Sequence, residues 1–417
     1  MKSKKINGIK SAREASLLAL LAWIKDDVYL ADSFQKIRTS QSLDTVDMQL
    51  AQEIAFGVVR RFWTLEAIIK KFLAQSRMKL KQEAKLILKM AVYQLVFMDK
   101  VPVYAVVFES VELSKKHSPY QAGFINGILR KLTALLPLKE LKKDLALEEY
   151  YSVPLEYIEK LQTSYPEKYE ELLEATISRP KMTFLELVKK EIEKEAVYLH
   201  EGKHFNYCAL KKDETSLKLL TSKGAYVQNP TPGILIEELV GNETYEKILD
   251  LCSAPGGKLV LLNRIFPKAK FYANEISKER ISRLKENLKK YQIDATIWNE
   301  DGTKLDTEEK FDLVVIDAPC SNSGVLNKKP EAKFRLQKQN LEDLKKTQAD
   351  LINSAVHILT PQGKIIYLTC SILPEENLEL ISNVLSQNKN LKLVKSLTVL
   401  PDLKYLDGGF GASLEIK

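Results

Sequence analysis

Apolar residues recur at helical spacing through the first 140 residues of the chain. This spacing predicts helices over 12–24, 48–73, 82–97, 103–116 and 123–132. Pro102 stands where the first turn of a helix tolerates proline. Residues 136–144 read as a linker. The pattern therefore predicts an all-α first domain over residues 1–140.

The pattern becomes mixed after this point. Short helices at 155–161 and 166–175, followed by strands at 182–187 and 207–210, indicate a small α+β subdomain over 145–235. From residue 236 to the end, strands alternate with helices. The expected strands are 247–251, 269–274, 294–298, 311–317 and 364–369, and the expected helices include 277–291 and 338–359. Such alternation predicts a doubly wound, Rossmann-like α/β domain over 236–417, with 408–417 as an antiparallel strand at the sheet edge.

Composition limits the kind of protein. The chain has 417 residues, 45% of them hydrophobic and 28% charged, as an ordinary globular protein has. Its longest apolar stretch, 17–24, is too short to span a bilayer, and the first residues lack the features of a signal peptide. We therefore expect a cytoplasmic location and no membrane partner. Four cysteines and four histidines show no CxxC or HExxH spacing, so we expect no metal site.

The net charge of +8 is unevenly distributed. Residues 1–140 hold 23 Lys and Arg against 13 Asp and Glu, a balance of +10, whereas the remainder has 40 against 42. A basic module joined to a nearly neutral enzyme fits phosphate binding. A solvated, lysine-rich helical surface explains the same count equally well.

The turn after the first strand of the sheet suits a polar cofactor. Asp250 ends this strand, Ala254–Gly257 let the backbone approach a ligand closely, and Lys258 begins the next helix. Glu275 follows the next strand, where an acid suits ribose hydroxyls, and Asp301 follows the third, where it suits an adenine amino group. The turn matches neither GxGxxG nor GxxxxGK[ST]. These positions favour S-adenosylmethionine over NAD and ATP.

Two cysteines follow the last two parallel strands. Because the carboxyl ends of such strands meet at one sheet edge, Cys320 and Cys370 should face the same crevice. Methylation of cytosine carbon 5 needs a thiolate to add at carbon 6, a group that supports charge at nitrogen 3, and a base. A helix expected near 374–376 would lower the pKa of Cys370, and a protonated Asp317 could hydrogen-bond the base edge. On the residues alone, either thiol qualifies as the nucleophile.

At this point a family resemblance becomes specific. The segments LDLCSAPGGK, DAPCSNSGVL and YLTCSILPEEN resemble the motifs of the Sun-type RNA cytosine-5 methyltransferases. GVVRRFWTLEAIIKKFL, PVYAVVFESVELSKK and GFINGILRKL resemble the NusB-like RNA-binding domain of the bacterial members. The resemblance covers nearly the whole chain. It implies methyl transfer from S-adenosyl-L-methionine to a cytosine of small-subunit (16S) ribosomal RNA, at the family site cytosine 967.

The resemblance also assigns roles to residues. Cys370 corresponds to the nucleophile, and Cys320 to the cysteine that helps release the product. On chemical grounds we expect Asp317 to steady the base. The expected donor contacts are Cys252, Ser253, Ala254, Pro255, Gly256, Gly257, Lys258, Glu275, Asp301 and Asp317.

The chain departs from the family pattern in several places, three of them near the expected site. Glu275 stands where the family usually has Asp. The family's Ser-Gly-x-Gly reads Ser-Asn-Ser-Gly at 321–324, and its Arg-Arg-x-Pro reads Asn-Lys-Lys-Pro at 327–330. Positive charge survives there, so RNA contact is still expected.

Two other functions remain open on the sequence. One keeps the chemistry but acts on tRNA or another rRNA site. The other is a catalytically silent RNA-binding or ribosome-assembly protein, against which the intact Asp317, Cys320 and Cys370 argue. We expect ribosomal RNA as the partner and a monomeric protein.

Overall fold

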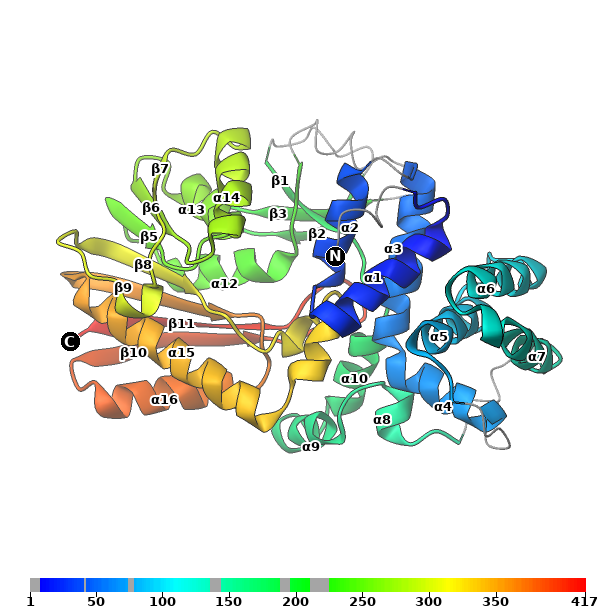
Figure 1. The fold of residues 1–417 in the computed structure, drawn as a ribbon. Coiled ribbons are helices and arrows are strands. Elements are labelled where there is room, and N and C mark those ends of the chain that lie inside the picture. The colour runs from blue at the N-terminus through cyan, green and yellow to red at the C-terminus, as the bar shows by residue number, and fades with distance from the viewer. Residues whose placement is uncertain (1–7, 41–42, 74–78, 136–143, 188–195, 211–224) are drawn as a thin grey trace. The chain divides into compact units, whose positions relative to one another are not determined.

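The structure, a computed structural model, describes residues 8–40, 43–73, 79–135, 144–187, 196–210 and 225–417 (Figure 1). The linker predicted at 136–144 lies outside these ranges except for Asp144. The chain divides into two compact units, Met1–Ile158 and Glu159–Lys417, which are described in turn.

The described residues of the first unit form helices joined by loops and turns, and none of them lies in a strand. Its α-helices are α1 (Ala12–Asp26), α2 (Leu30–Thr39), α3 (Thr45–Arg60), α4 (Phe62–Leu73), α5 (Gln82–Phe97), α6 (Val103–His117), α7 (Ala122–Thr133) and α8 (Leu147–Tyr150). Ser11 and Asp44 cap α1 and α3 with their side-chain oxygens. Fully buried apolar side chains of α1, α3 and α5, such as Leu20, Ile54 and Ile87, form its interior.

The single helix predicted over 48–73 is wrong, because α3 ends at Arg60 and α4 begins at Phe62. A distant segment stabilises the new helix start. The backbone N–H of Trp63 donates to Ser152 Oγ at 3.0 Å, and the Thr64 hydroxyl donates to the Glu149 carbonyl at 2.6 Å. The first N–H groups of a helix need such partners, and these come from almost 90 residues further along the chain.

The second unit begins with helices and a small sheet. α9 (Leu155–Ser164) crosses the boundary between the units, and α10 (Tyr169–Ile177) follows it. The antiparallel sheet has the order β2-β3-β1-β4 and is made of β1 (Thr183–Glu186), β2 (Ala196–Glu201), β3 (Asn206–Leu210) and β4 (Ala225–Val227). The two strands predicted here correspond to β1 and β3.

The larger sheet has seven strands in the order β10-β11-β9-β8-β5-β6-β7. Its strands are β5 (Lys247–Asp250), β6 (Lys270–Asn274), β7 (Ala295–Trp298), β8 (Phe311–Asp317), β9 (Leu359–Thr369), β10 (Leu391–Val399) and β11 (Gly409–Ile416). Strands β5 to β9 pair in parallel, and β10 and β11 are antiparallel to their neighbours. The helical domain followed by a Rossmann-like α/β domain confirms the predicted fold class.

One prediction about this sheet is wrong. The C-terminal strand β11 is not at the edge, because it lies between β9 and β10. The edge strand β10 carries exposed Lys392 and Lys395, which suit an edge because charged side chains discourage further pairing. Strand β11 instead buries Phe410, Ala412 and Leu414.

Helices cover both faces of the larger sheet (Figure 1). Leu313 and Val315 of β8 pack with α12 (Pro230–Val240), α13 (Gly257–Ile265) and α14 (Lys278–Lys290). Val314 and Ile316 point to the other face and pack with α15 (Lys338–His357) and α16 (Leu378–Gln387). Two buried faces explain the unbroken apolar runs of these strands.

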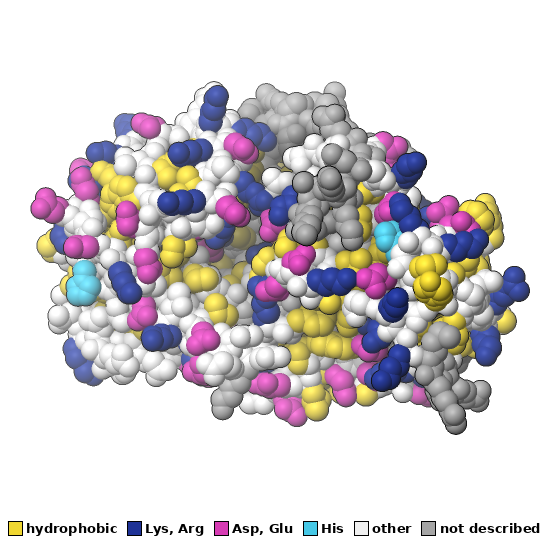
Figure 2. Space-filling view, viewed as in Figure 1, with side chains coloured by type: hydrophobic (Ala, Val, Ile, Leu, Met, Phe, Trp, Pro, Cys, Tyr) yellow, Lys and Arg dark blue, Asp and Glu magenta, His cyan; other side chains and the backbone are white. Residues whose placement is uncertain are grey.

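The surface carries mixed charge. Figure 2 shows Lys and Arg side chains interspersed with Asp and Glu over the face drawn.

Candidate active site

The two cysteine loops meet at the carboxyl ends of β8 and β9. These strands pair in parallel, with Asp317 opposite Leu368, so the segments that follow them leave the sheet side by side. Cys320 Sγ and Cys370 Sγ lie 3.1 Å apart. The chain therefore brings both predicted thiols to one place, as the positions of the strand ends indicate.

The two thiols have opposite tendencies to ionise. The hydrogen bond from Cys320 lowers the pKa of Cys370 below its ordinary value against the opposing effect of burial, and the positive charge of Lys329 adds to the lowering. The same hydrogen bond, together with burial, raises the pKa of Cys320. Cys370 is therefore the thiol that ionises more readily, and Cys320 stays protonated and donates the hydrogen bond between them.

The helix predicted near 374–376 begins as a 3₁₀ turn, Pro374–Glu376, and continues as α16 from Leu378. The neighbouring thiol and Lys329 are further causes of the lowered pKa of Cys370 that the sequence did not indicate.

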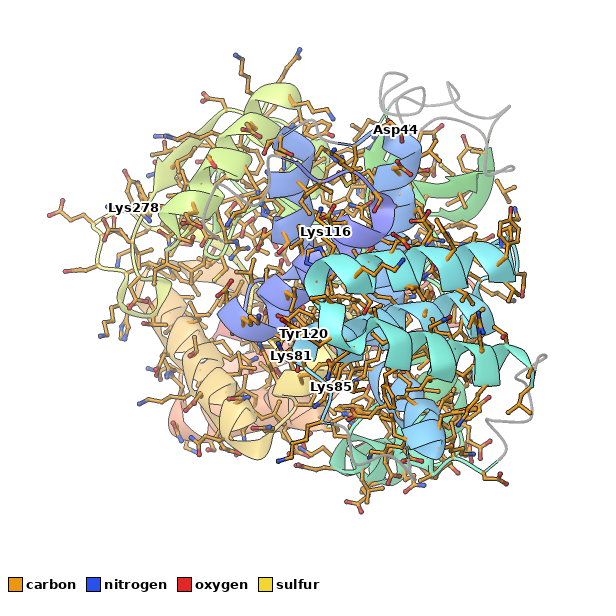
Figure 3. All side chains as sticks on the ribbon, turned by 45° about the vertical axis from the view of Figure 1, so that its right-hand side comes forward. Asp44, Lys81, Lys85, Lys116, Tyr120 and Lys278 are labelled. Atoms are coloured by element: carbon orange, nitrogen blue, oxygen red, sulfur yellow. The ribbon has the colours of Figure 1, made fainter. Side chains whose placement is uncertain are left out.

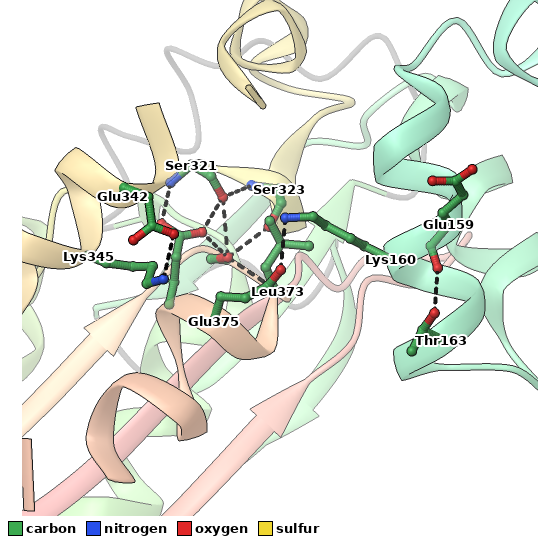
Figure 4. Close-up of polar contacts among 11 residues, drawn as sticks. Glu159, Lys160, Thr163, Ser321, Ser323, Glu342, Lys345, Leu373 and Glu375 are labelled. Carbon is green, nitrogen blue, oxygen red and sulfur yellow. Dashed lines mark hydrogen bonds and ion pairs between the residues drawn. The ribbon is translucent and has the colours of Figure 1, made fainter. Parts of the chain in front are cut away.

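A buried carboxylate joins the two cysteine loops. Glu376 is fully buried and accepts hydrogen bonds from the Ser321 N–H at 2.8 Å, the Ser321 hydroxyl at 2.5 Å and the Ser371 hydroxyl at 2.6 Å. Gln348 Nε2 of α15 donates a fourth bond at 3.0 Å. Ser371 also bonds to the Ser323 hydroxyl at 2.8 Å, in the network around Ser321 and Ser323 (Figure 4). These bonds fix the spacing of the loops that carry the thiols.

The neighbouring Glu375 has a different environment. It forms an ion pair with Lys160 of α9 at 2.8 Å, and its side chain keeps 27% of its surface exposed (Figure 4). The sequence shows two adjacent glutamates and gives no sign of which one is buried. Sequence analysis missed Glu376 and its serine partners for this reason.

The predicted donor turn joins β5 to α13. Gly256 has a φ of +98°, a left-handed conformation that glycine adopts without strain. Side chains of α14 hold the turn from outside, because Arg280 donates to the carbonyl of Ala254 and Asn287 donates to that of Pro255 at 2.8 Å. The turn is thus a preformed loop whose N–H groups stand at the start of a helix.

Acidic groups surround this turn. Lys258 Nζ lies 2.5 Å from Asp317 Oδ2. Burial alone would lower the pKa of Lys258, but the Asp317 carboxylate raises it above its ordinary value. Asp250 is fully buried, and among the described residues neither of its carboxylate oxygens has a hydrogen-bond partner. Burial and the negative charge of Asp317 raise the pKa of Asp250 to about 7.

Glu275 and Asp301 lie after β6 and β7, as predicted, but their surroundings differ. Glu275 is buried, accepts from the Ser277 N–H at 2.9 Å and lies 3.3 Å from Arg280. Asp301 is exposed and caps a short 3₁₀ turn by accepting from the N–H and hydroxyl of Thr303. These hydrogen bonds lower the pKa of Asp301.

With this geometry in place, known proteins give the family. Residues 238–411 match the family model of the 16S rRNA methyltransferase RsmB/F, and residues 10–134 match the NusB family. The chain carries an RsmB/F methyltransferase domain and a NusB-family domain. It is a methyltransferase, and the matched family implies a methyl donor of the S-adenosylmethionine type.

Relatives of this methyltransferase match it along most of its length. It is 28% identical over 403 residues to the ribosomal RNA small subunit methyltransferase B of Photorhabdus laumondii, covering 90% of this chain and 92% of that protein. The crystal structure of PH0851 aligns with a TM-score of 0.75 at 22% identity over 98% of both chains. NSun6 from Pyrococcus horikoshii, solved with SFG, gives a TM-score of 0.54 at 17% identity over 63% of this chain and 98% of that one. The two structures share its fold.

Two further features concern membranes and metals. In the part of the chain that the structure describes, no helix has the length and apolarity to cross a membrane. Among the same residues, no group of three or more His, Cys, Asp or Glu side chains is arranged to hold a metal ion.

Proposed function

We propose that this methyltransferase transfers a methyl group from S-adenosyl-L-methionine to carbon 5 of a cytosine in 16S ribosomal RNA, at the family site cytosine 967. The observation that carries the proposal is the 3.1 Å approach of Cys320 and Cys370 with opposite pKa directions. A protein that only binds RNA needs no such pair. Methylation of cytosine carbon 5 uses one thiol as a nucleophile and can use a second to end the covalent stage.

In the proposed mechanism the target base leaves its stack and enters the site. The Cys370 thiolate adds to carbon 6, and the electron pair of the carbon 5–carbon 6 double bond becomes available at carbon 5, shared with nitrogen 3, as an enamine. Asp317 holds the edge of the base. Its charge is balanced by Lys258, whose Nζ lies 2.5 Å from Asp317 Oδ2. Carbon 5 then takes the methyl group that the donor supplies. Cys320, acting as a base in its deprotonated form, accepts the carbon 5 proton; the electron pair of that C–H bond restores the carbon 5–carbon 6 double bond, and Cys370 leaves as a thiolate.

The residues at the turn fit the donor. The buried Asp250 and the nearby Ser253 hydroxyl have no partners among the described residues, and a positively charged amino group would provide them. The N–H groups at the start of α13 suit the carboxylate of the same molecule. We assign the donor to Cys252, Ser253, Ala254, Pro255, Gly256, Gly257, Lys258, Glu275, Asp301 and Asp317.

The test is transfer of a labelled methyl group to unmodified 16S rRNA, mapped by nucleotide, with tRNA as a parallel substrate. We expect a single labelled cytosine with the unaltered protein and no transfer with Cys370→Ala. Label in tRNA alone would overturn the rRNA target while leaving the chemistry intact. Transfer by Cys370→Ala at an undiminished rate would overturn the mechanism.

We further propose that residues 1–140 bind RNA, 145–235 support that binding, and 236–417 carry out catalysis. Lys81, Lys85 and Tyr120 are exposed on the helical unit (Figure 3). Buried Gln121 joins their loops by accepting from the Lys81 N–H at 3.0 Å and donating to the Lys79 carbonyl at 2.9 Å. Tyr120 is 91% exposed, which suits stacking on an unpaired base beside positive charge.

A binding measurement tests this surface. Replacing Lys81 and Lys85 by Glu should weaken binding to 16S rRNA at least about tenfold and reduce its dependence on salt. Tyr120→Ala should weaken binding by roughly 1–3 kcal/mol. Lys115→Ala is the control, because Lys115 is already paired with Glu112 at 2.6 Å. Equal affinities for all variants would contradict the assignment.

A further inference from the structure

Position 322 distinguishes this chain from the family pattern at the nucleophile. The pattern Ser-Gly-x-Gly reads Ser-Asn-Ser-Gly here, so Asn322 replaces a glycine. Asn322 has a φ of +58°, in the left-handed region that glycine and asparagine tolerate best. The backbone therefore accepts either residue, but only asparagine places a side chain between the cysteine loops.

The Asn322 amide touches both loops. Its Oδ1 accepts from the Cys370 thiol at 3.1 Å and from Lys329 Nζ at 2.7 Å. Its Nδ2 donates to the Cys320 carbonyl at 3.0 Å. The opposite amide orientation would set the NH₂ group against the Lys329 ammonium and the oxygen against a carbonyl, so the contacts determine which way the amide points.

The two adjacent lysines of this loop differ in their partners. Lys328 forms an ion pair with Asp407 at 2.8 Å, which balances its charge. The hydrogen-bond partner of the exposed Lys329 is the neutral Asn322 amide. Among the described residues, Lys329 Nζ bonds to the neutral Asn322 amide rather than to a carboxylate, and its charge acts on both Cys370 and Asp407.

We propose that Asn322 is a positioning residue that holds the Lys329 ammonium beside Cys370. The bond from the Cys370 thiol to Asn322 Oδ1 favours the protonated form, but the charge of Lys329 outweighs it and so favours the thiolate. A glycine at position 322 has no group that could hold this ammonium. The lowered pKa of Cys370, to which Lys329 contributes after Cys320, agrees with this role. The inference rests on the proposed function of Cys370 as the nucleophile.

The test measures the reactivity of Cys370 without RNA or donor. The protein is treated with iodoacetamide from pH 5.5 to 9.5, and labelling of the Cys370 peptide is followed by mass spectrometry. Asn322→Gly retains the backbone conformation, and Lys329→Met removes the charge. Each should raise the midpoint of the profile and slow labelling at pH 7 by about three- to tenfold. Lys329→Arg should restore most of the rate.

The double variant separates this role from a merely structural one. If Asn322 acts through Lys329, Asn322→Gly with Lys329→Met should shift the midpoint no further than the larger single change. Lys328→Met is the matched control and should leave the midpoint unchanged. An unchanged midpoint in Asn322→Gly, or fully additive shifts, would overturn the proposal.

This measurement is independent of the methylation assay. An unshifted labelling profile together with normal methyl transfer would remove the role of Asn322 alone. A shifted profile in a protein that transfers no methyl group would retain the role and overturn the proposed function.

Discussion

Cys252 and Cys370 occupy corresponding places in one sheet and differ in chemistry. Each follows a parallel strand and is largely enclosed by protein. Burial raises the pKa of Cys252, and the negative charges of Asp250, Asp317 and Glu275 raise it further. Cys370 has Cys320 and Lys329 as neighbours, which lower its pKa. A thiol at a strand end is therefore not reactive by position, because its neighbours decide whether it ionises.

The difference divides the site into an acid-lined donor side and a cysteine side. Carboxylates on the donor side suit a cation and keep Cys252 protonated. On the cysteine side, the carboxylate of Glu376 is saturated by hydrogen bonds and serves to hold the loops.

The largest expected effect concerns the two thiols directly. Iodoacetamide at pH 7 should label Cys370 much faster than Cys252, because the thiolate is the reacting form and the pKa of Cys370 is lowered while that of Cys252 is raised. Peptide mapping over time measures both rates in one sample. Comparable labelling rates would contradict the claim that the neighbours of Cys252 and Cys370 make the two thiols ionise differently.

The next effect concerns Glu376. Removing its carboxylate in Glu376→Ala leaves two hydroxyls, an amide and an N–H without their partner, and should cost about 3–5 kcal/mol of the free energy of unfolding. Urea unfolding measures this loss. The control Glu375→Ala breaks only a partly exposed ion pair and should cost less than about 1 kcal/mol. Similar losses for both variants would contradict the distinction between the adjacent glutamates.

The smallest effect in this series is the pH dependence due to Asp250. Its pKa rises from 3.8 to about 7 on folding, so the folded chain binds more protons than the unfolded chain between these values. The contribution of Asp250 to the free energy of unfolding therefore falls by roughly 2–4 kcal/mol as pH rises from about 4 to 7. Asp250→Asn removes this slope. Urea unfolding should show the stability of Asp250→Asn relative to the unaltered protein increasing with pH, and a pH-independent difference would refute the assignment.

Much of the site could be predicted because it follows strand ends. Parallel strands bring their carboxyl ends to one edge, so Asp317, Cys320 and Cys370 could be grouped from apolar runs and the residues after them. The same reasoning placed Glu275 and Asp301 after β6 and β7. The alternation of strands and helices likewise indicated the fold class.

The remaining features depend on contacts between distant residues. The start of α4 depends on Ser152, and the place of β11 depends on a further strand, β10, that sequence analysis did not predict. The pKa values of the two thiols differ chiefly because Cys320 and Cys370, 50 residues apart in the chain, lie 3.1 Å from each other, with the charge of Lys329 adding to the effect. Periodicity reports on the local backbone and carries no record of these partners.

The most direct test of the central claim uses Cys320→Ala, in which release of the product should be slowed. This variant is incubated with 16S rRNA and S-adenosylmethionine, and the RNA-linked peptide is identified by mass spectrometry. We predict a covalent adduct on the peptide containing Cys370. The double variant that combines Cys320→Ala with Cys370→Ala should form none. An adduct on any other residue, or continued methyl transfer by the variant lacking Cys370, would contradict Cys370 as the nucleophile.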